Sequence, residues 1–146
     1  MLNATGGVGG RTIKFITYDD AYSPPKTVEQ VRRMVESDQV EVMMGILGTS
    51  TNAAVQKYLN DRKIPQLFSL AASAKFGIPS KDPWTMGFPP TATLEGKIYG
   101  KYILDTKPNA KIAVLYQNDD LGRGSRSSQV RSWLSGGGDD CVGPEV

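Results

Sequence analysis

The chain has 146 residues, of which 39% are hydrophobic, and its 17 basic and 15 acidic side chains leave a formal net charge of only +2. A chain of this length buries one ordinary core, so it forms one domain or parts of two. The basic residues are scattered rather than gathered in a stripe, which argues against nucleic acid as a partner. No apolar run approaches the roughly 20 residues of a membrane-spanning helix, so we expect no direct membrane insertion.

The amino-acid inventory also removes many enzyme classes. The sequence contains no histidine and a single cysteine, Cys141. Nucleophilic sites built on Ser-His-Asp or Cys-His, and the HExxH zinc motif, are therefore excluded within this chain. Cys141 can form no internal disulfide, and no plausible set of metal ligands lies beside it in the sequence. We expect no catalytic site, no cofactor and no metal.

The first half of the chain alternates between strand and helix patterns. Residues 12–17 (TIKFIT) alternate in polarity and stop at two aspartates, as a strand ending in a turn does. A proline pair beginning at Pro24 indicates a helix start, because the first helical turn leaves its N–H groups unpaired. Strand character returns over residues 40–47 and 66–70, with a helix over residues 51–61 between them. This alternation predicts an α/β fold with a parallel sheet covered by helices.

The second half starts with a break in this rhythm. Residues 77–90 hold four of the nine prolines, which favours a crossing between two lobes. A helix over residues 92–105, a strand over 110–116 and a polar turn over 117–120 are then predicted. We expect two parts, residues 1–88 from a first lobe and residues 89–146 from a second. The tail 123–146, with three consecutive glycines, has low helix propensity and a doubtful structure.

Apolar residues at helical spacing give each predicted helix an inward face. The residues expected to face inward in the second and third predicted helices are Ala54, Val55, Tyr58, Leu59, Leu94, Ile98, Tyr102 and Ile103.

The candidate site begins with the segment GILGTSTN at residues 45–52, which follows an apolar run and opens a predicted helix. A helix N-terminus presents unpaired N–H groups and roughly half a positive charge, so it attracts a carboxylate or phosphate. Thr49, Ser50 and Thr51 would surround such an anion. The alternative is that these three residues only cap the helix, since Ser and Thr are favoured there on any helix.

A second candidate segment follows the next predicted strand, where Ala71, Ala72 and Ser73 form a turn of small residues. Ligands in open α/β sheets bind beyond the carboxyl ends of the strands. Small residues at two neighbouring strand ends leave room for a ligand. The six residues of the two segments therefore form the predicted ligand-binding site.

These segments resemble the type I periplasmic solute-binding proteins, specifically the branched-chain amino acid (leucine/isoleucine/valine) binding proteins of ABC importers. The matching stretches are GRTIKFITYDDAYSPPKTVEQVRRMVE, GILGTSTNAAVQKYLNDRKIPQLFSLAASAKFG, PWTMGFPPTATLEGKIYGKYIL and AKIAVLYQNDDLG, which cover most of residues 9–122. The resemblance implies two α/β lobes that close on a ligand like a hinge, with this chain holding part of each. It also implies a periplasmic location, an amino acid or related small molecule as the ligand, an ABC transporter permease as the partner, and no enzyme activity.

The resemblance also assigns roles to the candidate residues. It implies that the Thr49 hydroxyl and the N–H groups around Ser50 and Thr51 hold the α-carboxylate of the ligand. The Ala71 carbonyl and the Ser73 hydroxyl would receive the α-ammonium, with Ala72 in the same turn. Groups placed to pair both charges reject analogues that lack one of them.

The ends of the chain depart from the family pattern. Family members place a strand, a ligand-contacting loop and a helix before the glycine-rich turn found here at residues 6–10, so we expect one βα unit to be missing. A start codon placed too late would explain this, and the missing export signal. The exposed sheet edge would favour poor solubility or pairing with another chain. Leu121 stands where the family has a tyrosine, and the tail after residue 122 is either altered by a frameshift or divergent.

Three other functions remain open at this point. The same fold occurs in the ligand-binding regions of sensors and receptors, which a fused signalling domain would reveal. An α/β enzyme that uses a nucleotide would need a phosphate loop, but the glycines at 6–10 precede a predicted strand and lack the Lys-Ser/Thr ending. Finally, the gene could encode a fragment of a binding protein that no longer binds.

Overall fold

The computed structural model describes residues 2–108, 112–116 and 118–124. The predictions made for the tail from residue 125 onward lie outside the described residues. The element order combines short strands with three longer helices, and two single turns of 3-10 helix lie at Leu2–Thr5 (η1) and Ala74–Gly77 (η2).

Three short parallel strands form the sheet, in the order β1 (Met43–Met44), β2 (Gln66–Ser69) and β3 (Thr85–Gly87). Met43 pairs with Gln66, and Gln66 pairs in turn with Thr85. A further parallel bridge joins Leu47 to Leu70 beyond the strand ends. The predicted parallel α/β architecture is confirmed.

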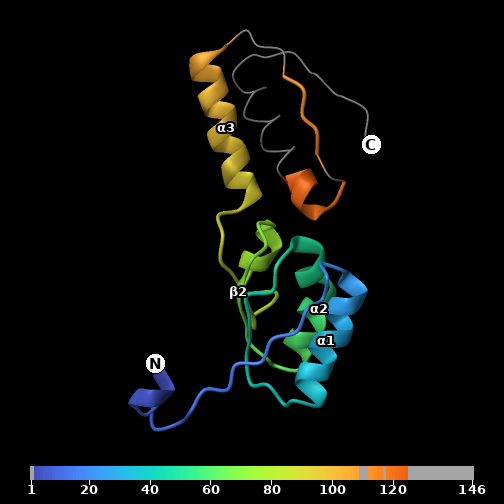
Figure 1. The fold of residues 1–146 in the computed structure, drawn as a ribbon. Helices are drawn as coiled ribbons and strands as arrows, with labels where there is room; N and C mark the ends of the chain where they lie inside the picture. Colours follow the sequence, from blue (N-terminus) through green and yellow to red (C-terminus); the bar gives the residue numbers. More distant parts are fainter. Residues whose placement is uncertain (1, 109–111, 117, 125–146) are drawn as a thin grey trace.

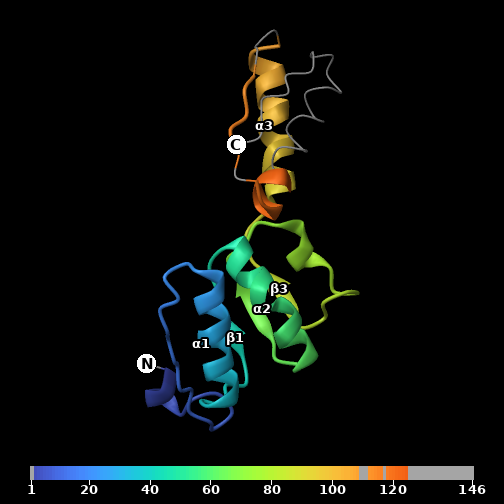
Figure 2. The same cartoon turned by 90° about the vertical axis from the view of Figure 1, so that its right-hand side faces the viewer.

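Two helices cover one face of this sheet: α1 (Pro24–Glu36) and α2 (Thr49–Asp61) lie side by side next to the strands (Figure 1, Figure 2). The helix α1 begins at the proline pair, as predicted, and α2 begins two residues before its predicted start. The buried core between the helices and the sheet consists of Val31, Met43, Val55 and Leu59. Each such side chain contributes roughly 1.5–3 kcal/mol when it is fully buried.

The third helix, α3 (Ala92–Thr106), extends away from the sheet (Figure 1). The Thr91 hydroxyl caps it by accepting a hydrogen bond from the Leu94 N–H at 3.3 Å. Residues 112–116 run back alongside α3, and a helical turn over residues 120–124 lies beside the N-terminal end of α3, near the sheet-bearing part (Figure 1, Figure 2). The predicted lobe boundary at residue 88 falls just before this helix and stays a prediction.

The predicted strand over residues 12–17 is wrong, because this segment does not pair with any described strand. A strand is stable only when a neighbour satisfies its backbone groups, and β1 is paired with β2 alone. Phe15 is accordingly 72% exposed. Polar contacts tether the start of the segment instead, since Asn3 makes two hydrogen bonds to the Ile13 backbone, at 2.7 and 2.8 Å.

Two other predicted strands are corrected in length or type. The prediction over residues 40–47 shrinks to Met43–Met44 plus the bridge at Leu47. In the prediction over residues 110–116, the described part, 112–116, is not a strand. Strand β3 was missed, because its three residues lie inside the proline-rich segment interpreted as a crossing.

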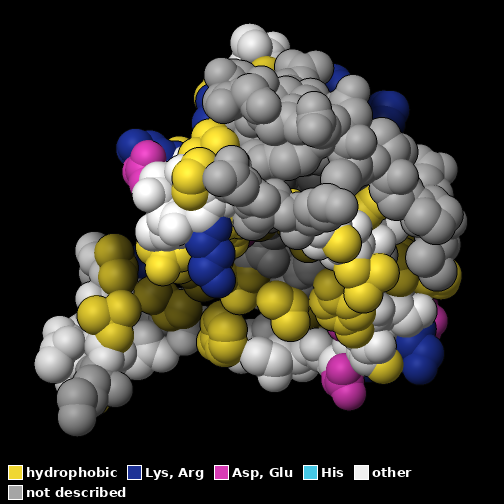
Figure 3. All heavy atoms as spheres, turned by 90° about the horizontal axis from the view of Figure 1, so that it is seen from above, with side chains coloured by type: hydrophobic (Ala, Val, Ile, Leu, Met, Phe, Trp, Pro, Cys, Tyr) yellow, Lys and Arg dark blue, Asp and Glu magenta, His cyan; other side chains and the backbone are white. Residues whose placement is uncertain are grey.

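The predicted inward faces hold for α2 only in part and fail for α3. In α2, Val55 and Leu59 are buried and Tyr58 is half-buried, but Ala54 is exposed. In α3 the buried residues are the small ones, Ala92, Gly96 and Gly100. The large residues Leu94, Ile98 and Tyr102 are at least half exposed. Apolar side chains are also plainly visible at the surface when the molecule is viewed from above (Figure 3).

Candidate ligand-binding site

The N-terminus of α2 is open to a ligand because its N-cap residue is a glycine. Gly48 occupies the N-cap with φ +97° and makes no side-chain cap. Thr49, Ser50 and Thr51 therefore lie in the first helical turn rather than at the cap. The alternative prediction, that these residues serve only as caps, does not match their positions. A helix that starts in this way leaves N–H groups of its first turn for another acceptor.

The three hydroxyls of this turn have different surroundings. Thr51 is fully buried, and its hydroxyl donates to the backbone carbonyls of Leu47 and Gly48. Thr49 is 4% exposed, and its hydroxyl has no hydrogen-bond partner within the described part of the chain. A buried hydroxyl without a partner costs roughly 1–3 kcal/mol. Thr49 is thus the polar group of this turn that has most to gain from a ligand.

A cavity of about 270 Å³ opens at this helix start. One wall is formed by Thr49 and Ser50, while the other comes from the segment around the helical turn at residues 120–124. The residues that line this second wall are Asn118, Asp119, Asp120 and Arg123. The cavity therefore lies between the sheet-bearing part of the molecule and the segment that follows α3.

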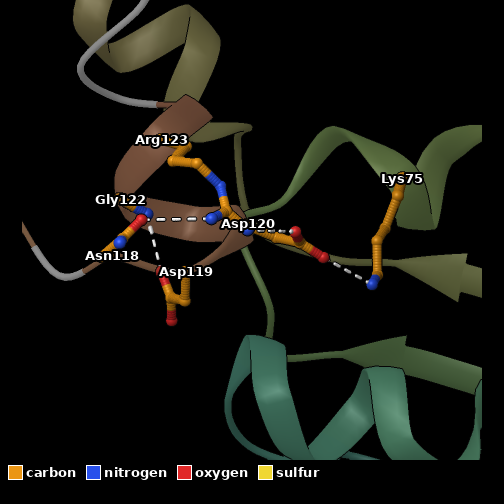
Figure 4. Close-up of polar contacts among 6 residues, drawn as sticks. All are labelled: Lys75, Asn118, Asp119, Asp120, Gly122 and Arg123. Atoms are coloured by element: carbon orange, nitrogen blue, oxygen red, sulfur yellow. Dashed lines mark hydrogen bonds and ion pairs between the residues drawn. The ribbon is translucent and has the colours of Figure 1, made fainter.

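The second wall is fixed by polar contacts around Asp120 (Figure 4). Lys75, from η2, donates to Asp120 Oδ2 at 2.8 Å across the two parts of the molecule. Arg123 lies 3.3 Å from Asp120 Oδ1 and donates to Asn118 Oδ1 at 3.1 Å. The hydrogen bond from Lys75 is the main cause that lowers the pKa of the Asp120 carboxyl below its ordinary value of 3.8.

The formal charges at the cavity balance. Asp119 and Asp120 in the lining carry two negative charges, and two positive ones are carried by Arg123 in the lining and by Lys75, which contacts Asp120 from outside it. The Asp119 carboxylate also caps the following helical turn, since it accepts from the Gly122 N–H at 2.8 Å. With the partial positive charge of the α2 N-terminus added, the cavity suits a ligand with one carboxylate, but not a strongly charged polyanion.

Asp120→Asn is expected to destabilise the chain slightly, by under about 1 kcal/mol at pH 7, because the ion pair is about half exposed and screened by water. The folded-state pKa of Asp120 is lowered, so its contribution is present above pH 3.8 and is lost as the pH falls through that lower pKa. Urea unfolding of the parent and of Asp120→Asn, at pH 7 and at pH 3, measures how far the difference in their stability shrinks at the lower pH.

The matched control is Asp105→Asn, which removes an ion pair with Lys101 within α3. This pair joins no two parts of the molecule. The stabilising role of ionised Asp120 would be contradicted if the stabilities of Asp120→Asn and the parent differed as much at pH 3 as at pH 7.

The second predicted segment lies apart from the cavity lining. Ala71 is buried, and Ser73 is half-buried. The Ala72 carbonyl accepts the Ala92 N–H at 2.7 Å, at the start of α3. The Gly48 N–H donates to the Leu70 carbonyl at 3.0 Å, which ties this turn to the start of α2. The structure thus brings Thr49 and Ser50 together with the second wall, but not Thr51 or residues 71–73.

Sequence reasoning missed the residues of the second wall. The sequence predicts only a polar turn over residues 117–120, and Asp119 caps the helical turn that follows. The available signal was the polar run QNDD, which follows an apolar segment just as GTSTN does. Arg123 and Lys75 carry no sequence signal of their own, because their roles depend on how the two parts of the chain meet.

The sequence profile of the periplasmic binding protein family matches residues 1–146, the whole chain. The chain belongs to this family. It is a family of binding proteins rather than enzymes. Within the described ranges, no group of three or more acidic or cysteine side chains is placed to hold a metal ion, and no helix is long and apolar enough to cross a membrane.

Two relatives of this periplasmic binding protein are amino acid binding proteins. An amino acid binding protein of Pseudomonas aeruginosa is 25% identical over an alignment of 132 residues that covers 84% of this chain and 33% of that protein. A leucine-specific-binding protein of Salmonella typhimurium is 26% identical over 129 residues, covering 88% of this chain and 34% of that protein. The chain thus spans about a third of the length of the curated relatives it matches.

Solved structures of solute-binding proteins share the fold. A solute-binding protein of an ABC transporter from Rhodopseudomonas palustris, in complex with 3,4-dihydroxybenzoic acid, aligns with a TM-score of 0.82 and 22% identity, over 93% of this chain and 37% of that one. The branched-chain amino acid transporter substrate-binding protein LivJ of Streptococcus pneumoniae, in complex with isoleucine, aligns with a TM-score of 0.77 and 23% identity. This alignment covers 90% of the present chain and 38% of LivJ. Ligands therefore vary among proteins that share this fold.

Proposed function

We propose that this chain is the ligand-binding part of a periplasmic solute-binding protein that delivers a branched-chain or related amino acid to the permease of an ABC importer. The observation that carries the proposal is Thr49, which lines the cavity at an uncapped helix start and whose buried hydroxyl has no partner among the described residues. The α-carboxylate of the ligand accepts from this hydroxyl and from the N–H groups of the first turn of α2.

The opposite wall supports a zwitterion over a simple acid. Asp119 and Asp120 belong to the wall of the cavity that faces the α2 N-terminus. An ammonium group on the ligand gains a charge-assisted hydrogen bond there, whereas a simple carboxylic acid leaves that wall unmatched. The roles predicted for the Ala71 carbonyl and the Ser73 hydroxyl remain part of the proposal, as does the division of the chain between two lobes at residue 88.

Isothermal titration of the purified chain tests this function. The panel is leucine, valine, glutamine and phenylalanine, with isopentylamine as leucine without its carboxylate and benzoate as an acid without an ammonium. Saturable binding of an amino acid, with neither analogue bound, supports the proposal. If benzoate alone bound, the proposed ligand would be an aromatic acid instead of an amino acid. No binding by a chain that unfolds cooperatively would favour the fragment hypothesis.

Thr49→Val is expected to weaken amino acid binding about tenfold or more, because valine keeps the shape of threonine but leaves the ligand carboxylate short of one buried donor. Thr106→Val is the control, since its hydroxyl donates to the Tyr102 carbonyl within α3, away from the cavity lining. The same titration measures both variants. Equal affinities of the parent and Thr49→Val would remove Thr49 from the site.

A further inference from the structure

A chain of buried polar side chains runs from the start of α2 across the sheet. Asn52 is fully buried in the second turn of α2, and its amide NH₂ donates to the Ile46 carbonyl at 2.7 Å and to the Gly48 carbonyl at 2.6 Å. Both acceptors belong to the loop that precedes α2. Gly48 has no side chain that could fix this loop, so the two hydrogen bonds from Asn52 hold it in place.

The amide of Asn52 has only one orientation that satisfies its neighbours. Gln66, 1% exposed on β2, donates to Asn52 Oδ1 at 2.8 Å. A reversed Asn52 amide would place its NH₂ group against the NH₂ group of Gln66 and its oxygen against two carbonyl oxygens, so three contacts would become repulsive. Gln66 is itself oriented by Thr85 on β3, whose hydroxyl lies 3.3 Å from Gln66 Oε1.

The far end of the chain of contacts is anchored by Asn60. Its amide donates to the Thr85 hydroxyl at 2.7 Å, and its Oδ1 accepts the Trp84 N–H at 3.0 Å. From Asn60, the hydrogen bonds thus pass through Thr85 on β3 and Gln66 on β2 to Asn52. Asn52 then binds the loop that sets the direction of the α2 N-terminus. Networks in which every member is satisfied hold one arrangement, because each alternative leaves a buried group unpaired.

We propose that Asn52 is a positioning residue for the ligand site and that Gln66 sets the orientation of its amide. By binding the Ile46 and Gly48 carbonyls, Asn52 fixes the loop before α2 and with it the position of the helix start that carries Thr49 and Ser50. This inference rests on the proposed function of the same cavity. Neither residue touches the ligand, since neither lines the cavity.

The inference is tested by Asn52→Ala and Gln66→Met, with Gln56→Met as the matched control. Gln56 is also a buried glutamine, on α2, but its side-chain nitrogen has no described partner. Amide hydrogen exchange of Gly48 and Leu70, whose N–H groups donate to the Leu70 and Ile46 carbonyls and so hold the loop before α2, is measured in the free protein, at a temperature where each variant is folded. We expect exchange at least tenfold faster in Asn52→Ala and Gln66→Met, and unchanged in Gln56→Met.

The exchange measurement needs no ligand, so it separates this inference from the proposed function. Slower or unchanged exchange in Asn52→Ala would overturn the positioning role, whether or not leucine binds to the parent chain. If exchange were accelerated equally in Gln56→Met, the hydrogen-bond network would contribute only to general stability and not to the position of the loop. Titration with leucine adds the functional readout, with an expected loss of about tenfold in affinity for Asn52→Ala and none for Gln56→Met.

Discussion

Leu59→Ala is expected to destabilise the chain by about 2–5 kcal/mol, because it removes a fully buried side chain from the core between α1, α2 and the sheet. The cost combines lost transfer free energy with the cavity that remains. Domains of ordinary size have a stability of roughly 5–15 kcal/mol, so this one change removes a large share of it. Urea unfolding followed by tryptophan fluorescence gives the difference in free energy.

The control for this change is Leu94→Ala on α3, where the leucine is 50% exposed. Removing the same atoms from a half-exposed position leaves no closed cavity, so we expect a loss of under about 1 kcal/mol. Similar losses for both variants would show that the core does not lie where α1 and α2 meet the sheet.

The helices could be predicted from the sequence because their signals are local. The proline pair sets the start of α1, and apolar spacing places Val55 and Leu59 inside. The prediction failed for α3, where periodicity selected the large side chains. The buried side there is formed by Gly96 and Gly100 instead, and a glycine face leaves no trace in a pattern of apolar residues.

The strands were harder to predict because strand formation depends on a neighbour. Residues 12–17 have the alternation of a strand but no strand beside them. The opposite error occurred at β3, where Gln66 donates its backbone N–H to the Trp84 carbonyl at 2.7 Å inside a proline-rich segment. A local pattern contains no information about which segment lies alongside in the folded chain.

The candidate site could be predicted on one side only. The run of hydroxyls at the start of α2 indicates an anion site from local chemistry alone. The facing wall depends on a contact across the molecule, between Lys75 and Asp120. No spacing rule connects residues 45 positions apart, so the wall could be recognised only once the structure was known.

Gly48→Ala is expected to combine a large loss of stability with a loss of ligand binding. At φ +97° and ψ 147° the backbone is in a region that is essentially restricted to glycine. A Cβ atom there would also lie 2.6 Å from the Tyr22 ring and 2.9 Å from Thr51 Oγ1. Strain and overpacking each cost roughly 1–3 kcal/mol, so we expect a total of about 2–6 kcal/mol by urea unfolding.

Two further variants separate the strain from the steric contact. Gly45→Ala has a positive φ of +73° but open space around its Cβ, so it reports backbone strain alone. Adding Tyr22→Ala to Gly48→Ala removes the closest contact, and a double-mutant cycle should recover about 0.5–3 kcal/mol of the loss. The Thr51 hydroxyl stays displaced in that double variant, and with it the carbonyls of the loop before α2. Leucine binding should therefore remain weak when stability returns, and full recovery of both would show that Tyr22 packing alone requires the glycine.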